Sequence, residues 1–314
     1  LRLEASQVLL NRNGKQTSEA GVLVGLKTDT ESYGSLSLEG VLRDKGDSLG
    51  SFWQRNLPIN SEWFANNGLG MINTPAIGLS QQQYRFFIPT MTIMGGSTEW
   101  RHVSEDFTAL AGMGQPGFYS GIRMPGFKAQ PGTVSSVGAQ ANLGEGLKAG
   151  IQLVNASDTS LYYQQSIATH ALNAQGALAS LLWRDGNTTI HGNLINSDSN
   201  LYGQHSGAWL DALWRDDLLD HRAGFFRLEP GLLWGNQYMA SNLEGVYYRA
   251  AYQRSQWQFD GGFDYAAQVN GSEAGTTFFT ANARYQYSRD WGFGGGSNVR
   301  SGPHNAWSAF AYLN

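Results

Sequence analysis

The residue types that could carry out chemistry are few in this chain, and their spacing does not favour catalysis. His205 and Ser206 adjoin in "GQHSG" and are the residue types of a hydrolytic dyad. On a strand, however, neighbouring side chains leave opposite faces and cannot meet. The glycine run "GFGGGSN" at 292–298 lacks the strand-to-helix context of a phosphate-binding loop, and the histidines show no spacing typical of metal ligands. We therefore predict no catalytic residue, no metal site, no cofactor and no enzyme activity.

Polar side chains, some of them charged, recur instead at every second position of extended segments. The clearest case is "QWQFDGGFDYAAQ", residues 256–268, in which aromatic side chains alternate with polar ones. Because successive side chains of a β-strand leave opposite faces, this pattern predicts a strand with one aromatic face and one polar face. The function depends on which of the two faces is the inside.

If the polar faces enclose water, the charged residues on them would line a pore and let a polar solute pass. The candidates carry both signs and are Glu99, Arg101, Lys148, Arg184, Asp211, Arg215, Arg249, Asp260, Asp264 and Arg284. The alternative is that opposite charges pair across strands and only brace the wall. One such pairing follows from a hairpin at 254–255 with Tyr252 opposite Trp257, which would place Arg249 opposite Asp260. A loop over 269–275 with Gln268 opposite Thr276 would place Arg284 on the other side of Asp260.

Similar alternation, separated by turn signals such as Asp185-Gly186, runs along the whole chain. No helical period is sustained. We predict an all-β fold, an antiparallel transmembrane β-barrel of about sixteen strands with a long inserted loop or plug. Residues 1–314 would form a single domain. A soluble antiparallel sandwich would show the same period of two and stays open as an alternative.

The composition of the apolar face favours lipid as its surroundings. Small apolar residues lie between aromatic rings, as expected where rings with polar tips lie at the two membrane interfaces. The rings on the apolar face of three consecutive segments are Tyr248, Tyr252, Trp257, Phe259, Phe263, Tyr265, Phe279, Tyr285 and Tyr287. The outside of the barrel would then be apolar and the inside wet.

Bulk composition agrees with this class of protein. Charged residues make up 15% of the 314 residues, against roughly 25% in globular proteins. The pI of about 5.9 and the lack of a clustered basic face argue against nucleic acid as a partner. No apolar run is long enough to predict a membrane-spanning helix.

Two stretches lack any period. The first, residues 55–92, is too rich in apolar side chains to be a solvated tail, so we predict that it folds into the barrel as a plug or constriction. Its candidate gating residues are Trp63, Phe64, Met71, Tyr84, Phe86 and Phe87. An extracellular loop that packs on its neighbours is the alternative. The second stretch is 114–132. We also expect all eight prolines of the chain to lie between strands, because proline has no amide hydrogen to donate to a neighbouring strand.

The alternating aromatic segments, the glycine content and the insertion "SEWFANNGLGMINTPAIGLSQQQYRFFIPT" together resemble Gram-negative outer-membrane export channels. The resemblance is to the porin domains of exopolysaccharide exporters. It covers the whole chain as a pattern, without a diagnostic motif, and the end "AYLN" departs from the usual terminal aromatic residue. It implies a passive, gated channel in the bacterial outer membrane for a secreted polymer, foremost a polysaccharide. Its partners would be membrane lipid, the polymer, and periplasmic or lipoprotein assembly factors.

Other functions remain open from the sequence. They are a substrate-selective diffusion porin, a secretion pore of the fimbrial-usher type, an outer-membrane hydrolase and a soluble adhesive β-protein. The chain starts within an alternating segment and without an export signal, and it still alternates at its end. We therefore expect further sequence before Leu1, as the exporter resemblance also implies, and beyond Asn314.

Overall fold

The computed structural model describes residues 1–12, 15–44, 48–121, 125–161, 171–254, 256–271 and 274–313. Ser255 and Asn314, which enter two of the predictions above, lie outside these ranges. Within them, one antiparallel sheet of 19 strands holds nearly all of the regular structure, beside a two-stranded hairpin and one short helix. No helix in the described ranges is long and apolar enough to cross a membrane.

The strands follow one another closely along the chain. The first ten are β1 (Arg2–Arg12), β2 (Lys15–Thr30), β3 (Gly34–Arg43), β4 (Leu49–Pro58), β5 (Trp63–Asn73), β6 (Thr92–His102), β7 (Phe107–Ser120), β8 (Gly126–Ala129), β9 (Thr133–Gly144) and β10 (Leu147–Thr159). The others are β11 (Leu172–Asp185), β12 (Thr188–Ser199), β13 (Gly203–Arg215), β14 (Asp220–Leu228), β15 (Leu233–Trp234), β16 (Gln237–Tyr238), β17 (Leu243–Arg254), β18 (Trp257–Ala267), β19 (Thr276–Gln286), β20 (Gly292–Ser301) and β21 (Ala306–Leu313). Helix α1 (Gly78–Gln81) lies between β5 and β6.

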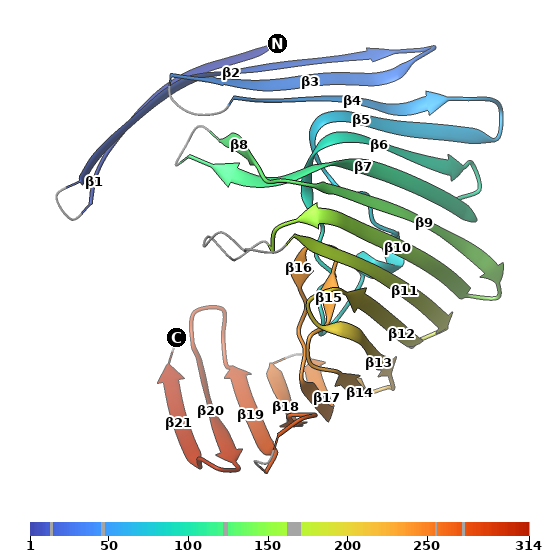
Figure 1. The fold of residues 1–314 in the computed structure, drawn as a ribbon. Coiled ribbons are helices and arrows are strands. Elements are labelled where there is room, and N and C mark those ends of the chain that lie inside the picture. The colour runs from blue at the N-terminus through green and yellow to red at the C-terminus, as the bar shows by residue number, and fades with distance from the viewer. Residues whose placement is uncertain are drawn as a thin grey trace.

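The large sheet is an up-and-down meander. Without β8, which pairs only with β7, eighteen strands follow one another in sequence order, the β15–β16 hairpin standing apart. Figure 1 shows the sheet curving round, with β1 and β21 as its two edges and an opening between them. The connections at one end, such as 144–147 and 185–188, are short, and we call this the short-turn end. The opposite end carries the long segments 74–91 and 229–242.

The predicted all-β antiparallel barrel class is confirmed. In the described ranges β1 and β21 are not paired with each other, and the wall has eighteen strands in place of about sixteen. The difference arises in residues 55–92, which do not form one insertion as predicted. Residues 55–58 end β4, and residues 63–73 form β5, which pairs with β6 along its whole length. A register shift between Gln54 and Leu57 interrupts the alternation there and hides the strands from a pattern search.

Two prolines also lie inside strands rather than between them. Pro58 is the last residue of β4. Pro116 of β7 pairs with Ile93 of β6, beyond the point at which β9 leaves β7 at Gly114. Both positions are places where strand pairing changes, which is where a sheet tolerates a residue without an amide hydrogen.

The register separates the two faces of the sheet as predicted. We call the face covered by residues 74–91 the inner face and the other the outer face. On β18, Trp257, Phe259 and Phe263 lie on the outer face and are 42%, 44% and 37% exposed, whereas Asp264 on the inner face is buried. The predicted ring residues of β17, β18 and β19 share the outer face and contact one another across strands. Tyr287 lies just beyond β19.

The inner face is not uniformly wet, contrary to the prediction. Its middle carries apolar side chains, and residues of 74–91 and 229–242 pack on them to form the largest buried cluster. The buried members include Phe86, Met91, Val154, Leu178, Ile195, Trp209, Phe226 and Trp234. A single curved sheet has no second layer, so apolar side chains of the inner face are covered by inserted segments.

The assignment of the outer face can be tested with one charge placed on either side of β19. Ala281 is exposed on the outer face, and its neighbour Thr280 lies on the inner face. In lipid, an arginine on the outer face at mid-strand costs about 2–4 kcal/mol. We expect Ala281→Arg to lower the free energy of unfolding in lipid vesicles by that amount, and Thr280→Arg to change it far less. Equal losses would contradict the assignment.

Candidate functional site

Residues 74–91 form a segment that leaves the wall between β5 and β6 and returns beside its starting point. The amide of Thr74 donates to the carbonyl of Met91 at 2.8 Å, and the amide of Met91 donates to the Thr74 hydroxyl at 3.0 Å. The two ends of the segment are therefore closed as a continuation of the β5–β6 ladder. Figure 1 shows the segment on the concave side of the sheet, near β15 and β16. We call it the inner segment.

Gln152 of β10 anchors the first part of the inner segment. Its Oε1 accepts from the amide of Ile77 at 3.2 Å and lies 3.3 Å from the Ser80 hydroxyl, while its Nε2 donates to the carbonyl of Pro75 at 3.2 Å. The side chain is buried. Since buried polar groups need partners, one wall residue satisfies three polar groups of the segment.

Gln83 anchors the middle of the inner segment. Its side-chain amide exchanges two hydrogen bonds of 3.0 Å with the amide of Asn193 on β12, and its Oε1 also accepts from the indole of Trp209 on β13 at 2.9 Å. Asn193 in turn accepts from the Ser180 hydroxyl of β11 at 2.6 Å. The network links three wall strands to one residue of the segment.

Arg85 of the inner segment forms an ion pair with a carboxylate of β18. Its Nη1 lies 2.6 Å from Oδ1 of Asp264, and Arg249 of β17 lies 2.5 Å from the other oxygen of that carboxylate. The Arg85 guanidinium also stacks on the rings of Phe226 and Tyr247, at 4.6 and 4.9 Å from their centroids. Partly buried ion pairs of this kind fix a geometry more than they add stability.

Two glycines of the wall make room for these contacts. A Cβ on Gly150 would lie 2.8 Å from a methyl carbon of Ile77, and a Cβ on Gly224 would lie 2.5 Å from the ring of Tyr247. Tyr247 of β17 therefore passes over Gly224 of β14 and donates its hydroxyl to Asp211 of β13. Glycine is required where a ring crosses a strand this closely.

A second inserted segment, 229–242, supports the first. Leu233 donates its amide to the Ser197 hydroxyl of β12 at 3.2 Å, and Trp234 packs over Gly176 of β11. Gln237 donates to the carbonyl of Thr90 at 3.2 Å, which joins the two segments directly. Together they cover the middle of the inner face.

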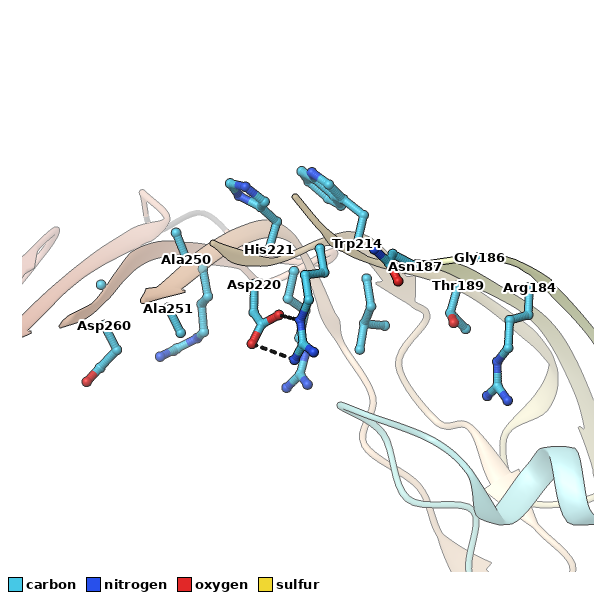
Figure 2. A pocket seen from close by; sticks show the side chains of 15 residues that line it. Arg184, Gly186, Asn187, Thr189, Trp214, Asp220, His221, Ala250, Ala251 and Asp260 are labelled. Atoms are coloured by element: carbon cyan, nitrogen blue, oxygen red, sulfur yellow. Dashed lines mark hydrogen bonds and ion pairs between the residues drawn. The ribbon is translucent and has the colours of Figure 1, made fainter. Parts of the chain in front are cut away.

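A hollow of about 590 Å³ lies beside the inner segment toward the short-turn end, and we call it the first hollow. Its charged inner-face residues are Arg184, Arg215, Asp220, Arg222, Arg249 and Asp260. Figure 2 shows the side chains of Arg184, Asp220 and Asp260 on one side of the sheet and those of Trp214 and His221 on the other. Four guanidinium groups thus face two carboxylates.

A second hollow of about 510 Å³ lies on the other side of α1. Its charged lining residues are Glu99, Arg101, Glu105 and Lys148. Arg101 lies 3.6 Å from Glu99 and donates to the Asn56 side chain at 2.9 Å. The second hollow has as many acidic as basic side chains, whereas basic side chains are in excess in the first hollow.

The ten charged residues predicted to share the polar face all lie on the inner face, but the predicted pairing among three of them is wrong. In the β17–β18 ladder Tyr252 lies opposite Phe259, and Arg249 lies opposite Gly262. Asp260 lies opposite Asn282 and accepts its side-chain amide at 2.8 Å, while Arg284 donates to Gln286 at 2.7 Å. Each register is shifted by two residues, which preserves the face and changes the partner.

The predicted gating residues divide into two groups. Trp63, Phe64 and Met71 belong to the wall strand β5, which corrects the prediction that they lie in a plug. Tyr84 and Phe86 belong to the inner segment and contact the rings of Tyr247 and Trp209 respectively.

Phe87 lies in the same segment and is 77% exposed.

Sequence reasoning missed Arg222, Asp220 and Arg85. The alternation of "DHRAGFFRL" could have found the first two, because it places Asp220, Arg222 and Gly224 on one face. No local pattern signals Arg85.

The structure agrees with the sequence argument against a dyad at His205 and Ser206. The His205 ring contacts the carbonyl of Tyr202 at 2.8 Å, and Ser206 donates its hydroxyl to Glu229 at 3.1 Å. Among the described residues no group of three or more His, Asp or Glu side chains is placed to hold a metal ion. The candidate site is therefore the pair of hollows.

Comparison with known proteins shows the fold of this chain but does not assign the chain to a family. No protein-family model and no curated protein matches the sequence. The structure is similar to the outer membrane protein OpdK of Pseudomonas aeruginosa, with a TM-score of 0.52 at 11% identity over 95% of this chain and 92% of that one. This chain has the fold of an outer-membrane β-barrel.

Two further structures support that assignment. OpdQ of Pseudomonas aeruginosa gives a TM-score of 0.52 at 9% identity over 99% of this chain and 95% of that one. OpdK has also been solved with vanillate, and that structure gives a TM-score of 0.50 at 11% identity over 95% and 92% of the two chains. The localisation predicted from the sequence, the outer membrane, is the one stated for OpdK.

The anchor at Gln152 can be tested by a change that keeps the volume of the side chain. We expect Gln152→Leu to lower the free energy of unfolding by about 1–3 kcal/mol, because the amide of Ile77 and the carbonyl of Pro75 lose a buried partner. Gln175→Leu, on the outer face of β11, is the matched control and should change it little. Thermal unfolding in detergent measures both. An equal effect of the two variants would contradict the anchoring role.

Asp216, in the turn between β13 and β14, gives a test by pH. Its carboxylate bonds with the His221 ring at 3.0 Å and accepts two backbone amides, and these bonds lower its pKa to about 2 from 3.8. The ionised form therefore stabilises the turn above pH 3.8, and this stabilisation is lost as the pH falls through about 2. Carboxylate titration by NMR should give a midpoint near the lower value, and an unshifted midpoint would contradict the hydrogen bonding.

Proposed function

We propose that this protein is a diffusion porin of the outer membrane whose first hollow favours small organic anions. The observation that carries the proposal is the local excess of cations. Arg184 and Arg222 line the first hollow, and within the described residues neither of them forms a salt bridge. The whole chain has a net charge of −4, so this excess reflects placement rather than composition.

The sizes of the hollows favour a small solute over a polymer. The inner segment is fixed to four wall strands, β10, β12, β13 and β18, through the hydrogen bonds and the ion pair described above. It leaves spaces of about 590 and 510 Å³, which suit a small molecule. The likeness to OpdK, which binds vanillate, an aromatic carboxylate, in one solved structure supports the same choice. Polymer export, the main sequence-based interpretation, has no comparable support.

The orientation in the membrane is part of the proposal. Outer-membrane barrels have short turns on the periplasmic side and longer loops outside. The short-turn end would then face the periplasm, and solutes would meet the inserted segments first and the first hollow second. Closure of the barrel requires that the free edges of β1 and β21 be paired, because lipid offers no partner to an open strand edge.

The charge preference can be tested by comparing two solutes of equal shape. In proteoliposome swelling, benzoate should enter faster than uncharged benzamide. Arg184→Gln with Arg222→Gln should slow benzoate and leave benzamide unchanged, because only the anion interacts with these charges. Arg227→Gln is the control, since Arg227 lies on the outer face of β14 and pairs with Glu244. Equal entry of both solutes into wild-type vesicles would contradict the proposal.

Whether the inner segment obstructs the pore can be tested by removing that segment. A deletion of residues 60–85, which the sequence alone would suggest, would remove β5. Replacing residues 75–90 by Asn-Gly keeps the bonds between Thr74 and Met91 and offers a favoured hairpin turn. We expect a higher single-channel conductance. Replacing residues 302–305, at the same end of the sheet, is the control, and unchanged conductance in the first variant would show that the segment does not obstruct the pore.

A further inference from the structure

Arg222 of β14 is held by a ring that comes from the inner segment. Its guanidinium carbon lies 3.7 Å from the centroid of the Tyr84 ring, the shortest cation–ring distance among the described residues. The same guanidinium forms no ion pair and no side-chain hydrogen bond within the part of the chain that the structure describes. A ring face attracts a cation without neutralising its charge. The charge of Arg222 therefore remains available to a solute in the first hollow.

A carboxylate that could capture Arg222 lies close by. Asp211 of β13 is paired with Gly224, two residues along β14 from Arg222 and on the same face. Diagonal neighbours of this kind are within reach of a long side chain. One oxygen of Asp211 accepts the Tyr247 hydroxyl, but the other, Oδ2, is buried and has no hydrogen-bond partner in the described residues. Arg222 thus stacks on Tyr84 although an unsatisfied acceptor is near.

The position of Tyr84 is fixed by its neighbours in the segment. Gln83 is bonded to Asn193 and Trp209, and Arg85 is paired with Asp264. The Tyr84 ring itself lies 5.7 Å from the ring of Tyr247. With both flanking residues attached to the wall, the ring of Tyr84 has a defined place from which it holds Arg222.

The charges next to Arg222 strengthen the positive potential that its guanidinium produces. Arg249 lies directly opposite Arg222 in the β14–β17 ladder, and like charges at such positions repel. Arg249 shares Asp264 with Arg85, so one carboxylate serves two guanidinium groups. The region around Arg222 therefore presents a positive charge that the Asp211 carboxylate would compensate if Arg222 turned to it.

We propose that Tyr84 is a positioning residue for anion selectivity, which holds the Arg222 guanidinium away from Asp211 and toward the first hollow. This inference rests on the proposed function. It makes the inner segment a part of the selectivity filter rather than an obstruction alone. Removal of the ring would let Arg222 pair with Asp211, and the positive charge of Arg222 would then be compensated instead of facing the hollow.

The experiment measures the chloride-to-potassium permeability ratio from reversal potentials in planar bilayers under a potassium chloride gradient. We expect Tyr84→Leu to lower the ratio roughly two- to fivefold, the effect of one charge in a solvated site. Arg222→Gln should lower it equally, and Tyr84→Phe, which keeps the ring, should retain the wild-type ratio. Phe87→Leu, in the same segment and 77% exposed, is the matched control and should also retain it.

A second set of variants, made in a protein that carries Asp211→Asn, distinguishes the positioning of Arg222 from a general disturbance of the inner segment. With Asp211→Asn in place there is no carboxylate to capture Arg222, so adding Tyr84→Leu should leave the ratio of that background unchanged. A fall as large as in the native background would overturn the inference, as would a wild-type ratio in Tyr84→Leu. A wild-type protein that prefers potassium would instead overturn the proposed function. Tyr84→Gln gives the same test if the leucine variant does not fold.

Discussion

The absence of a second layer is the constraint on which the rest of this structure depends. A single curved sheet leaves its inner face without a partner layer, and here two segments of the chain itself supply the cover. Their backbone groups cannot all pair within the segments, so wall side chains such as Gln152 and Ser197 complete them. The apolar middle of the inner face, the glycines that receive rings and the amide network around Gln83 all follow from this need.

The same constraint sets the electrostatics of the hollows. Where the inner segment covers the wall, the wall side chains are mostly apolar or amide, with Asp211 and Asp264 as charged exceptions. The charged residues of the first hollow lie toward the short-turn end. Cross-strand pairs neutralise some of them, as Arg215 with Asp220 does. Arg184 and Arg222 line the first hollow without a salt bridge, and an anion is the solute that such a surface attracts.

Much of the wall could be predicted from the sequence, because a period of two is visible wherever one face meets lipid and the other does not. The faces of β18 and the neighbouring strands follow from that period alone. The register does not, since a shift by two residues preserves every face. For this reason the sequence predicts Arg249 beside Asp260, whereas in the structure it pairs with Asp264. The strand β5 was hidden by an irregular register near Gln54, and the partners of Arg85 depend on contacts between residues far apart in the chain. No local pattern carries such information.

The central claim is that the uncompensated guanidinium groups of the inner face make this channel prefer anions. The most direct measurement is the sign of the reversal potential of the wild-type protein in a planar bilayer that separates two concentrations of potassium chloride. The account predicts the sign produced by chloride crossing faster than potassium, with a magnitude that falls as the salt concentration rises and screens the charges. A reversal potential of the opposite sign, or one of zero, would contradict it.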